Sequence, residues 1–413
     1  MTGQFPPLYR VEQHFSDTSI SDVSAAVRAE FAKFKPGGRI KPGQSVAVGV
    51  PSRGVHDLKE IVATTVACLR ELGLQPYITP AMGSHGGATG QGQISVLDGL
   101  GINQDTTGAP VRGSMEVASL GRIASGAEVF IAKDALEADH VVVINRVKPH
   151  TSFRAEVESG LCKILAVGLG RRVGASNIHK YQLGETIVPA AKLIMQKVSV
   201  LLGVAVTETP LGGTNSVRLA RPEEFQATDR ELLQEAWTLF PRLPVDQLDI
   251  LLVDEAGKDI SGAGMDINII GFWRRDGGER MPDYRILALF SLTPDSHGNA
   301  LGVGYADLIP QRMRDAVDMQ ATYMNALASG ALRSARMPLT LETDRRVVEA
   351  ALSLVPDPLN ARVARISNTL NLGTFWVSAP VLAELRQEPG LTVHEQPLAL
   401  EFDHQDVLRR FSV

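Results

Sequence analysis

The sequence predicts an α/β protein made of two domains, each built on a mainly parallel sheet. Three observations support this: a strand–helix–strand succession over residues 45–80, an almost wholly apolar strand at residues 140–144, and a length of 413 residues. Strand–helix–strand order is the unit of a parallel sheet, and a strand that is apolar on both faces belongs at its centre. A chain of this length exceeds what one hydrophobic core usually supports, so we expect two domains.

The strand–helix–strand unit consists of apolar strands at residues 45–52 and 75–80 around a segment of helical periodicity at 57–72. Asp57 is a candidate N-cap for this helix and Gly73 a candidate stop signal. The other elements expected before residue 245 are strands at 128–131, 140–144 and 198–206, and helices at 183–196 and 231–239.

A further strand is expected at 249–253, and a second α/β region is expected to begin with a strand at 284–292 and helices near 311–328 and 344–354. We place the boundary near 270–285. This gives an N-terminal domain, residues 1–275, that carries the cofactor and acid/base residues, and a C-terminal domain, residues 276–413, that closes the cleft. The active site is expected in the cleft between them.

Composition narrows the function classes. The net charge is −5 and no block of like charge stands out, which disfavours a nucleic-acid partner. No apolar run is long enough to cross a bilayer, and the N-terminus lacks the pattern of a signal peptide. Cys68 and Cys162 each lie among apolar residues and are expected to be buried free thiols. We therefore expect a cytoplasmic protein without membrane partners; a homo-oligomer stays open.

The strand at 140–144 leads directly into a turn that carries Arg146, Lys148, His150 and Arg154. Ligands of open α/β sheets bind beyond the carboxyl ends of the strands. Four positive groups there favour an anionic substrate or a phosphate. The structural alternative is a basic turn in solvent.

Three more residues are candidates for chemistry. His85 lies in a glycine-rich loop, whose backbone can approach a ligand closely, although such a loop can also be plain flexible surface. Lys163 lies among apolar residues, which would lower its pKa and free the amine as a nucleophile, unless the side chain extends to water. His179 could bind a metal, but with no Cys, His or carboxylate nearby the remaining ligands would have to come from outside the protein.

In their order along the chain, Arg53, His85, His150, Lys163 and His179 resemble the nickel-dependent lactate racemase family and its superfamily of hydroxyacid racemases and epimerases. The resemblance covers roughly residues 40–270. It implies a nickel-pincer nucleotide (pyridinium-3,5-bisthiocarboxylic acid mononucleotide nickel) tethered to Lys163, with His179 as the nickel ligand. It further implies that His85 and His150 act as acid and base, and that Arg53 binds the substrate carboxylate.

The sequence also departs from the family pattern. The stretch between His150 and Lys163 is longer than usual, and the second domain lacks the family's Tyr-Gln-x-x-Lys motif. The nearest candidate offers Tyr323 and Asn325 as substrate-binding residues, without a lysine. The segment 259–266 is a further candidate for the pocket. These departures indicate a divergent member that acts on an acid other than lactate.

The resemblance therefore implies a racemase or epimerase, an isomerase, of a small 2-hydroxy acid that works by reversible hydride transfer to the tethered nucleotide. The two histidines would serve as acid and base for the proton of the substrate hydroxyl, one for each position that this hydroxyl takes in the two enantiomers. Cofactor-synthesis enzymes would be partners in maturation. The alternative is a non-catalytic or differently catalytic protein that binds an anion or phosphate and kept the fold without the cofactor.

Overall fold

The computed structural model describes residues 5–52 and 54–411, which form two compact units. One unit is Ser16–Phe240; the other combines the chain up to Phe15 with the chain from Pro241 onward. The boundary predicted near residue 275 is wrong because it would separate β9 (Ile250–Ala256) from β10 (Ile286–Leu292), which pair in parallel within one sheet. A backbone ladder of this kind requires both strands to fold together.

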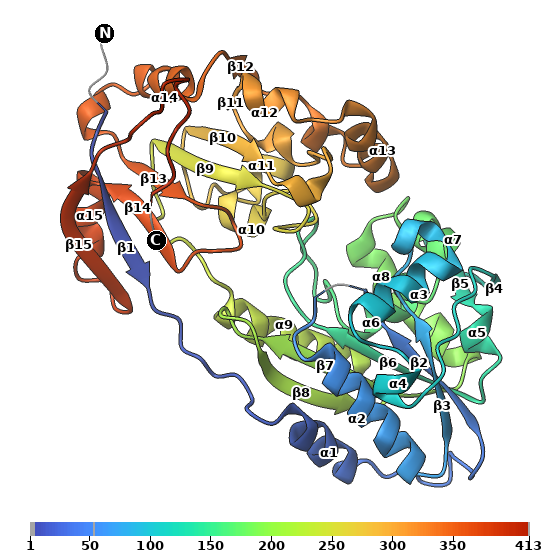
Figure 1. The fold of residues 1–413 in the computed structure, drawn as a ribbon. Helices are drawn as coiled ribbons and strands as arrows, with labels where there is room; N and C mark the ends of the chain where they lie inside the picture. The colour runs from blue at the N-terminus through green and yellow to red at the C-terminus, as the bar shows by residue number, and fades with distance from the viewer. Residues whose placement is uncertain (1–4, 53, 412–413) are drawn as a thin grey trace. The chain divides into compact units, whose positions relative to one another are not determined.

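The unit Ser16–Phe240 is built on a five-stranded sheet in the order β3-β2-β6-β7-β8 (Figure 1). Its strands are β2 (Ser45–Val50), β3 (Gln75–Pro80), β6 (His140–Arg146), β7 (Val200–Glu208) and β8 (Thr214–Ala220). All are parallel except the edge strand β8. The chain goes from β2 outward to β3 and later returns to β6 on the other side of β2. This reversal creates a topological switch point at the carboxyl ends of β2 and β6, where ligands of such sheets bind.

Both faces of this sheet are buried, as the apolar strand at 140–144 predicted. Along β6, Val141 and Val143 belong to one hydrophobic cluster, and Val142 and Ile144 to another. Because successive side chains of a strand point to opposite faces, this alternation means that helices cover both sides. The second cluster takes in α1 (Val23–Lys33), α2 (Leu58–Glu71) and α3 (Gly90–Gly99). The first takes in α6 (Leu161–Lys163), α7 (Arg171–Ile178), α8 (Leu183–Lys197) and α9 (Phe225–Leu239).

The strand predicted at 128–131 is present as β5 (Glu128–Ala132), which pairs with β4 (Val117–Arg122) in a separate two-stranded sheet. Two other local expectations need correction. Helix α9 begins at Phe225, earlier than predicted. Asp57 precedes α2 in a left-handed conformation and makes no side-chain cap bond; its carboxylate instead accepts a hydrogen bond of 2.9 Å from the Thr214 hydroxyl. Two short helices complete the unit, α4 (Gln104–Thr107) and α5 (Lys133–Leu136).

The other unit contains an eight-stranded sheet in the order β12-β11-β10-β9-β13-β14-β1-β15 (Figure 1). Strands β9 to β13 run parallel, whereas β14, β1 and β15 are joined by antiparallel ladders. The bounds not yet given are β1 (Leu8–Gln13), β11 (Leu308–Pro310), β12 (Leu339–Leu341), β13 (Val363–Ile366), β14 (Thr374–Ser378) and β15 (Leu391–Leu398). The helices are α10 (Ile267–Ile270), α11 (Trp273–Asp276), α12 (Gln311–Asp315), α13 (Met319–Ser329), α14 (Asp344–Ser353) and α15 (Ala379–Leu385).

The helix predicted near 311–328 is in fact two, α12 and α13. The Asp318 carboxylate accepts hydrogen bonds from the amides of Gln320 and Ala321 and so starts α13 anew. A side chain that caps a helix N-terminus in this way marks the start of a new helix, which hydrophobic periodicity alone does not reveal.

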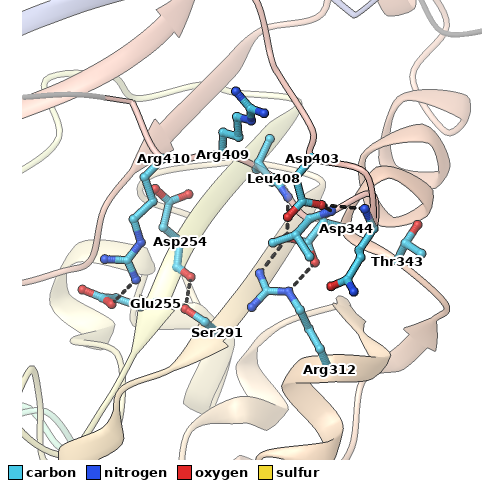
Figure 2. A network of polar contacts seen from close by, with 12 residues as sticks. Asp254, Glu255, Ser291, Arg312, Thr343, Asp344, Asp403, Leu408, Arg409 and Arg410 are labelled. Atoms are coloured by element: carbon cyan, nitrogen blue, oxygen red, sulfur yellow. Dashed lines mark hydrogen bonds and ion pairs between the residues drawn. The ribbon is translucent and has the colours of Figure 1, made fainter.

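Within this unit, polar contacts of charged side chains hold the C-terminal residues against the rest of the fold (Figure 2). The fully buried Asp344 accepts two hydrogen bonds from Arg312, at 2.8 and 2.6 Å, and one from the Leu408 amide at 2.9 Å. Arg410 pairs with Glu255 at 2.5 Å.

Cys68 and Cys162 are buried free thiols, as predicted. Across residues 5–52 and 54–411, no helix has the length and apolar character needed to span a membrane.

Candidate functional site

The carboxyl ends of β2, β3 and β6 lie at one edge of the sheet and carry three of the predicted site segments. Ser52 follows β2, His85 follows β3, and His150 follows β6. The hydroxyl of Ser52 is hydrogen-bonded to Nδ1 of His85, so the structure brings the first two loops together. The predicted carboxylate anchor Arg53 lies outside the described residues.

The loop that carries His85 is fixed by a fully buried glutamine, Gln93. Its amide nitrogen donates to the carbonyl of Gly83 at 2.9 Å and to that of His85 at 3.3 Å. The amide of Gly83 also donates to the carbonyl of Gly168 at 3.1 Å. Gly83 has a positive φ and lies so close to Ala175 that an added Cβ would approach it to 3.2 Å. The His85 loop therefore rests directly on the segment that leads from Lys163 to His179.

A buried arginine extends this support. Arg171 begins α7, the helix that ends just before His179, and its side chain has no exposed surface. Its guanidinium donates to Oε1 of Gln93 at 3.0 Å, to the Thr79 hydroxyl at 2.7 Å and to the Asp134 carboxylate at 3.2 Å. Neither Arg171 nor Gln93 was predicted as a site residue. Because both act through the tertiary fold, no local pattern marks them.

His150 is held in one orientation. Its amide donates to the carboxylate of Glu158 at 2.7 Å, and its Nδ1 accepts a hydrogen bond from the Ser152 amide at 3.0 Å. Since Nδ1 is an acceptor, the neutral imidazole carries its proton on Nε2. The ring stacks on Phe153 with a centroid separation of 4.5 Å. His150 therefore has a defined tautomer with a proton to donate at Nε2.

Glu158 connects His150 with Lys163. Its side chain is 2% exposed, and burial raises the pKa of this carboxyl, while the bond from His150, the charge of Arg154 and, less strongly, that of Lys163 lower it. A charge effect of this kind requires the Lys163 ammonium to lie in the neighbourhood of the carboxyl. Glu158 therefore holds the His150 turn by a hydrogen bond and is acted on by the charge of Lys163.

Lys163 is the last residue of α6 and is half-buried, among the apolar residues that the sequence indicated. A π-helical turn, Ile164–Gly168, follows immediately, with the Leu169 amide donating to the carbonyl of Ile164 at 2.9 Å. Such turns are rare and occur frequently at functional sites.

His179 follows α7 and donates from Nδ1 to the carbonyl of Ala175 at 2.6 Å. A carbonyl only accepts, so Nδ1 carries the proton and the lone pair lies on Nε2. Although the residue keeps accessible surface, desolvation lowers the pKa of the imidazole, and the charge of Lys163 lowers it further, against the opposite effect of the Ala175 carbonyl. The ring is thus neutral and oriented, which is the state of a metal-ligating histidine.

No protein metal cluster surrounds His179. Within the described part of the chain, no three His, Cys, Asp or Glu side chains are grouped so that they could hold a metal ion. A metal at this imidazole would therefore need its other ligands from a bound group.

The predicted basic cluster after β6 is largely neutralised. Arg146 forms a half-buried ion pair with Glu208. Arg154 lies 3.8 Å from Glu158 and stacks over the ring of Trp237 at 4.8 Å. Both guanidiniums thus serve the fold, and the turn is less suited to bind an anion than the sequence suggested.

In the other unit, Tyr323 and Asn325 lie on α13. The amide oxygen of Asn325 accepts a hydrogen bond of 2.7 Å from the ammonium of Lys258, which also donates to the carbonyl of Gly262 at 2.8 Å. Lys258 follows β9, and it is the one lysine that the sequence contains from residue 241 onward. The α13 segment contains no lysine, and the ammonium that contacts it belongs to a residue 67 positions before Asn325 in the sequence.

Comparison by sequence gives one domain family: a domain of unknown function, DUF362, matches residues 50–221. That range holds the β2, β3 and β6 strand ends and the segment from Lys163 to His179. A search of curated proteins returned no significant match.

Comparison by structure gives two informative neighbours. The lactate racemase apoprotein from Thermoanaerobacterium thermosaccharolyticum aligns with a TM-score of 0.55 and 11% identity over 87% of this chain and 98% of its own. A crystal structure of a protein from Thermotoga maritima aligns with a TM-score of 0.50 and 14% identity over 65% of this chain and 70% of its own. The chain thus has a mixed α/β fold like that of lactate racemase.

Proposed function

We propose that this protein is a racemase or epimerase of a small 2-hydroxy acid and that it uses a nickel-pincer nucleotide attached to Lys163. The observation that carries the proposal is the pair formed by Lys163 and His179: a half-buried lysine whose charge acts on an imidazole that is oriented by the Ala175 carbonyl and kept neutral by desolvation. The lactate-racemase-like fold supports the same assignment.

The residues present fit such a group. A nucleotide tethered at Lys163 would bring its own sulfur and carbon donors, and Nε2 of His179 would add the one ligand that the protein supplies. This agrees with the absence of any three-residue metal cluster from the described chain. It also agrees with the bond from Nδ1 of His179 to the Ala175 carbonyl, which orients the ring and fixes its tautomer.

When bound, the group supplies a reversible acceptor for the substrate's α-hydrogen together with its electron pair. The protein then has to remove and return the proton of the substrate hydroxyl. His150 offers a proton at Nε2, and His85 is held through Nδ1 by the Ser52 hydroxyl. Two histidines at the same edge of the sheet, after β3 and after β6, would allow one to take the proton while the other returns it on the opposite face.

The substrate carboxylate requires a cation. Arg53 remains the predicted anchor at the end of β2. In the other unit, we propose three substrate-binding residues: Tyr323, Asn325 and Lys258. Lys258 would take the substrate-binding role that the family motif gives to a lysine in the α13 segment. A cation suits a hydroxy acid, since a fixed carboxylate holds the α-carbon in place during the reaction.

The alternative of a cofactor-free anion- or phosphate-binding protein is less well supported. Arg146 and Arg154 are already paired with Glu208 and Glu158. A histidine held neutral, as His179 is, also contributes little to the binding of an anion.

The decisive experiment is intact-protein mass spectrometry with metal analysis on chain produced together with the cofactor-synthesis enzymes. We expect about one nickel per chain and a mass increase that maps to Lys163 and disappears in Lys163→Ala. Lys192→Ala, at an exposed lysine of the same unit, should keep both. Wild-type protein without nickel and without the adduct, although made alongside an active cofactor pathway, would rule the proposal out.

A further inference from the structure

We propose that Asp229 is a positioning residue for Lys163: its carboxylate clamps the first turn of the short helix that presents the amine. The significance of Lys163 rests on the proposed function, whereas the clamp itself is a feature of this fold. No local pattern marks Asp229, which lies on α9, 66 residues after Lys163.

The contacts are short and double. One carboxylate oxygen of Asp229 accepts from the Leu161 amide at 2.7 Å, and the other accepts from the Cys162 amide at 2.8 Å. The Asp229 side chain is 1% exposed. A carboxylate that receives two adjacent amides fixes both the position and the direction of the chain between them. The next residue in the chain is Lys163.

A second tie and a close approach complete the clamp. The side-chain amide of Asn145, near the end of β6, donates to the carbonyl of Gly160 at 2.7 Å. Gly160 has a φ of +87°, and a Cβ built on it would lie 2.0 Å from the Asp229 carboxylate. Only glycine can occupy this position with the carboxylate in place. Residue 160 is thus held from both sides, by β6 and by α9.

The helix needs this external support. α6 contains three residues, and the π-helical turn that follows changes the hydrogen-bond spacing. The first amides of a helix have no partner within it, and so short a helix has few bonds of its own. Burial raises the pKa of Asp229 to about 7, against the effect of the two amides. Asp229 therefore supplies, despite the cost of its burial, the hydrogen-bond partners that the first turn of α6 lacks.

The test compares the wild type with Asp229→Asn and with Glu235→Gln. Asn keeps the size of the side chain but turns an NH₂ group toward one of the two amides. Glu235 lies on the same helix and holds the Thr207, Asn215 and Ser216 side chains, so its variant controls for a general loss of α9 contacts. The rate of lysine acetylation by an N-hydroxysuccinimide ester is measured by peptide mass spectrometry between about pH 6 and pH 9, with Lys192 as the internal reference.

We expect the Lys163:Lys192 rate ratio to change by about fivefold or more in folded Asp229→Asn, because an amine displaced by an ångström reacts in different surroundings. In Glu235→Gln the ratio should stay within about twofold. A positioning role also predicts that the pH profile of the Lys163 rate changes shape in Asp229→Asn only. An unchanged ratio and profile in folded Asp229→Asn would overturn the inference.

Asn145→Ala serves as the second variant if Asp229→Asn does not fold. It removes only the tie from β6 to Gly160 and should change the same ratio by about twofold or more; no change there contradicts the clamp. Acetylation needs no cofactor, so this result is separate from the proposed function. If wild-type protein carried no adduct at Lys163, the proposed function would be wrong, but the acetylation result would still be valid evidence for the clamp.

Discussion

Lys163 and His179 lie close enough together that, after burial itself, the charge of the Lys163 ammonium lowers the pKa of the imidazole. The two residues are 16 positions apart in the sequence. The π-helical turn and α7 lie between them.

His179→Asn should lower the nickel content of cofactor-loaded protein by about tenfold or more, because the ligand nitrogen Nε2 is lost. Metal analysis and intact mass, measured on the same sample, check this. His404→Asn, at an exposed histidine near the C-terminus, should retain the metal. Full nickel content in His179→Asn would remove His179 as the ligand.

His85→Asn and His150→Asn should each lower the rate of interconversion of a 2-hydroxy acid by about 10²- to 10⁴-fold in both directions. Both directions suffer because one histidine takes the hydroxyl proton and the other returns it. The readout is chiral chromatography over a panel of 2-hydroxy acids, with nickel content as the control for loading. A variant that retains full activity would show that its histidine is not an acid or base of the reaction.

Lys258→Met should raise KM for the hydroxy acid by about tenfold or more and change kcat less, because it removes a cation that binds the carboxylate in ground state and transition state alike. Lys258→Arg keeps the charge and should recover part of the loss. The adduct at Lys163 should be unaffected in both variants. Equal kinetics of Lys258→Met and wild type would exclude Lys258 from the substrate site.

Gly160→Ala should destabilise the protein by about 3 kcal/mol or more, because it combines a positive φ with a collision against Asp229. Gly38→Ala is the matched control: Gly38 also has a positive φ, but a Cβ there meets nothing within 4 Å. That change should cost about 1 kcal/mol. Urea unfolding of both variants gives the comparison, and equal losses would contradict the tight contact at Gly160.

Stability should depend on pH through Asp229. Burial raises its pKa to about 7, above the ordinary value of 3.8, so between these values the folded chain binds the proton more strongly than the unfolded chain. The free energy of unfolding should therefore fall as pH rises from about 4 to about 7, by an amount on the order of 4 kcal/mol. In Asp229→Asn this contribution is absent, so the Tm advantage of the wild type should shrink over the same range. Parallel Tm curves for the two proteins would argue against a raised pKa.

The fold was largely predictable because hydrophobic patterning is local. The apolar runs at 45–52, 75–80 and 140–144 predicted parallel strands, and these became β2, β3 and β6. The domain boundary was not predictable in this way. It depends on β1 joining β14 and β15, hundreds of residues later, and on β9 pairing with β10 across the supposed boundary.

The sequence by itself determined which residue types are available for chemistry, since His85, His150, Lys163 and His179 stand out by their neighbours in the chain. Only the tertiary structure decided how they are held: Gln93 and Arg171 beneath the His85 loop, Glu158 between His150 and Lys163, and Asp229 at the start of α6. It likewise brought Lys258 to Asn325. The physical reason is that periodicity and turn chemistry are written in adjacent residues. A buried hydrogen bond, in contrast, joins side chains whose separation in sequence carries no information about their distance in space.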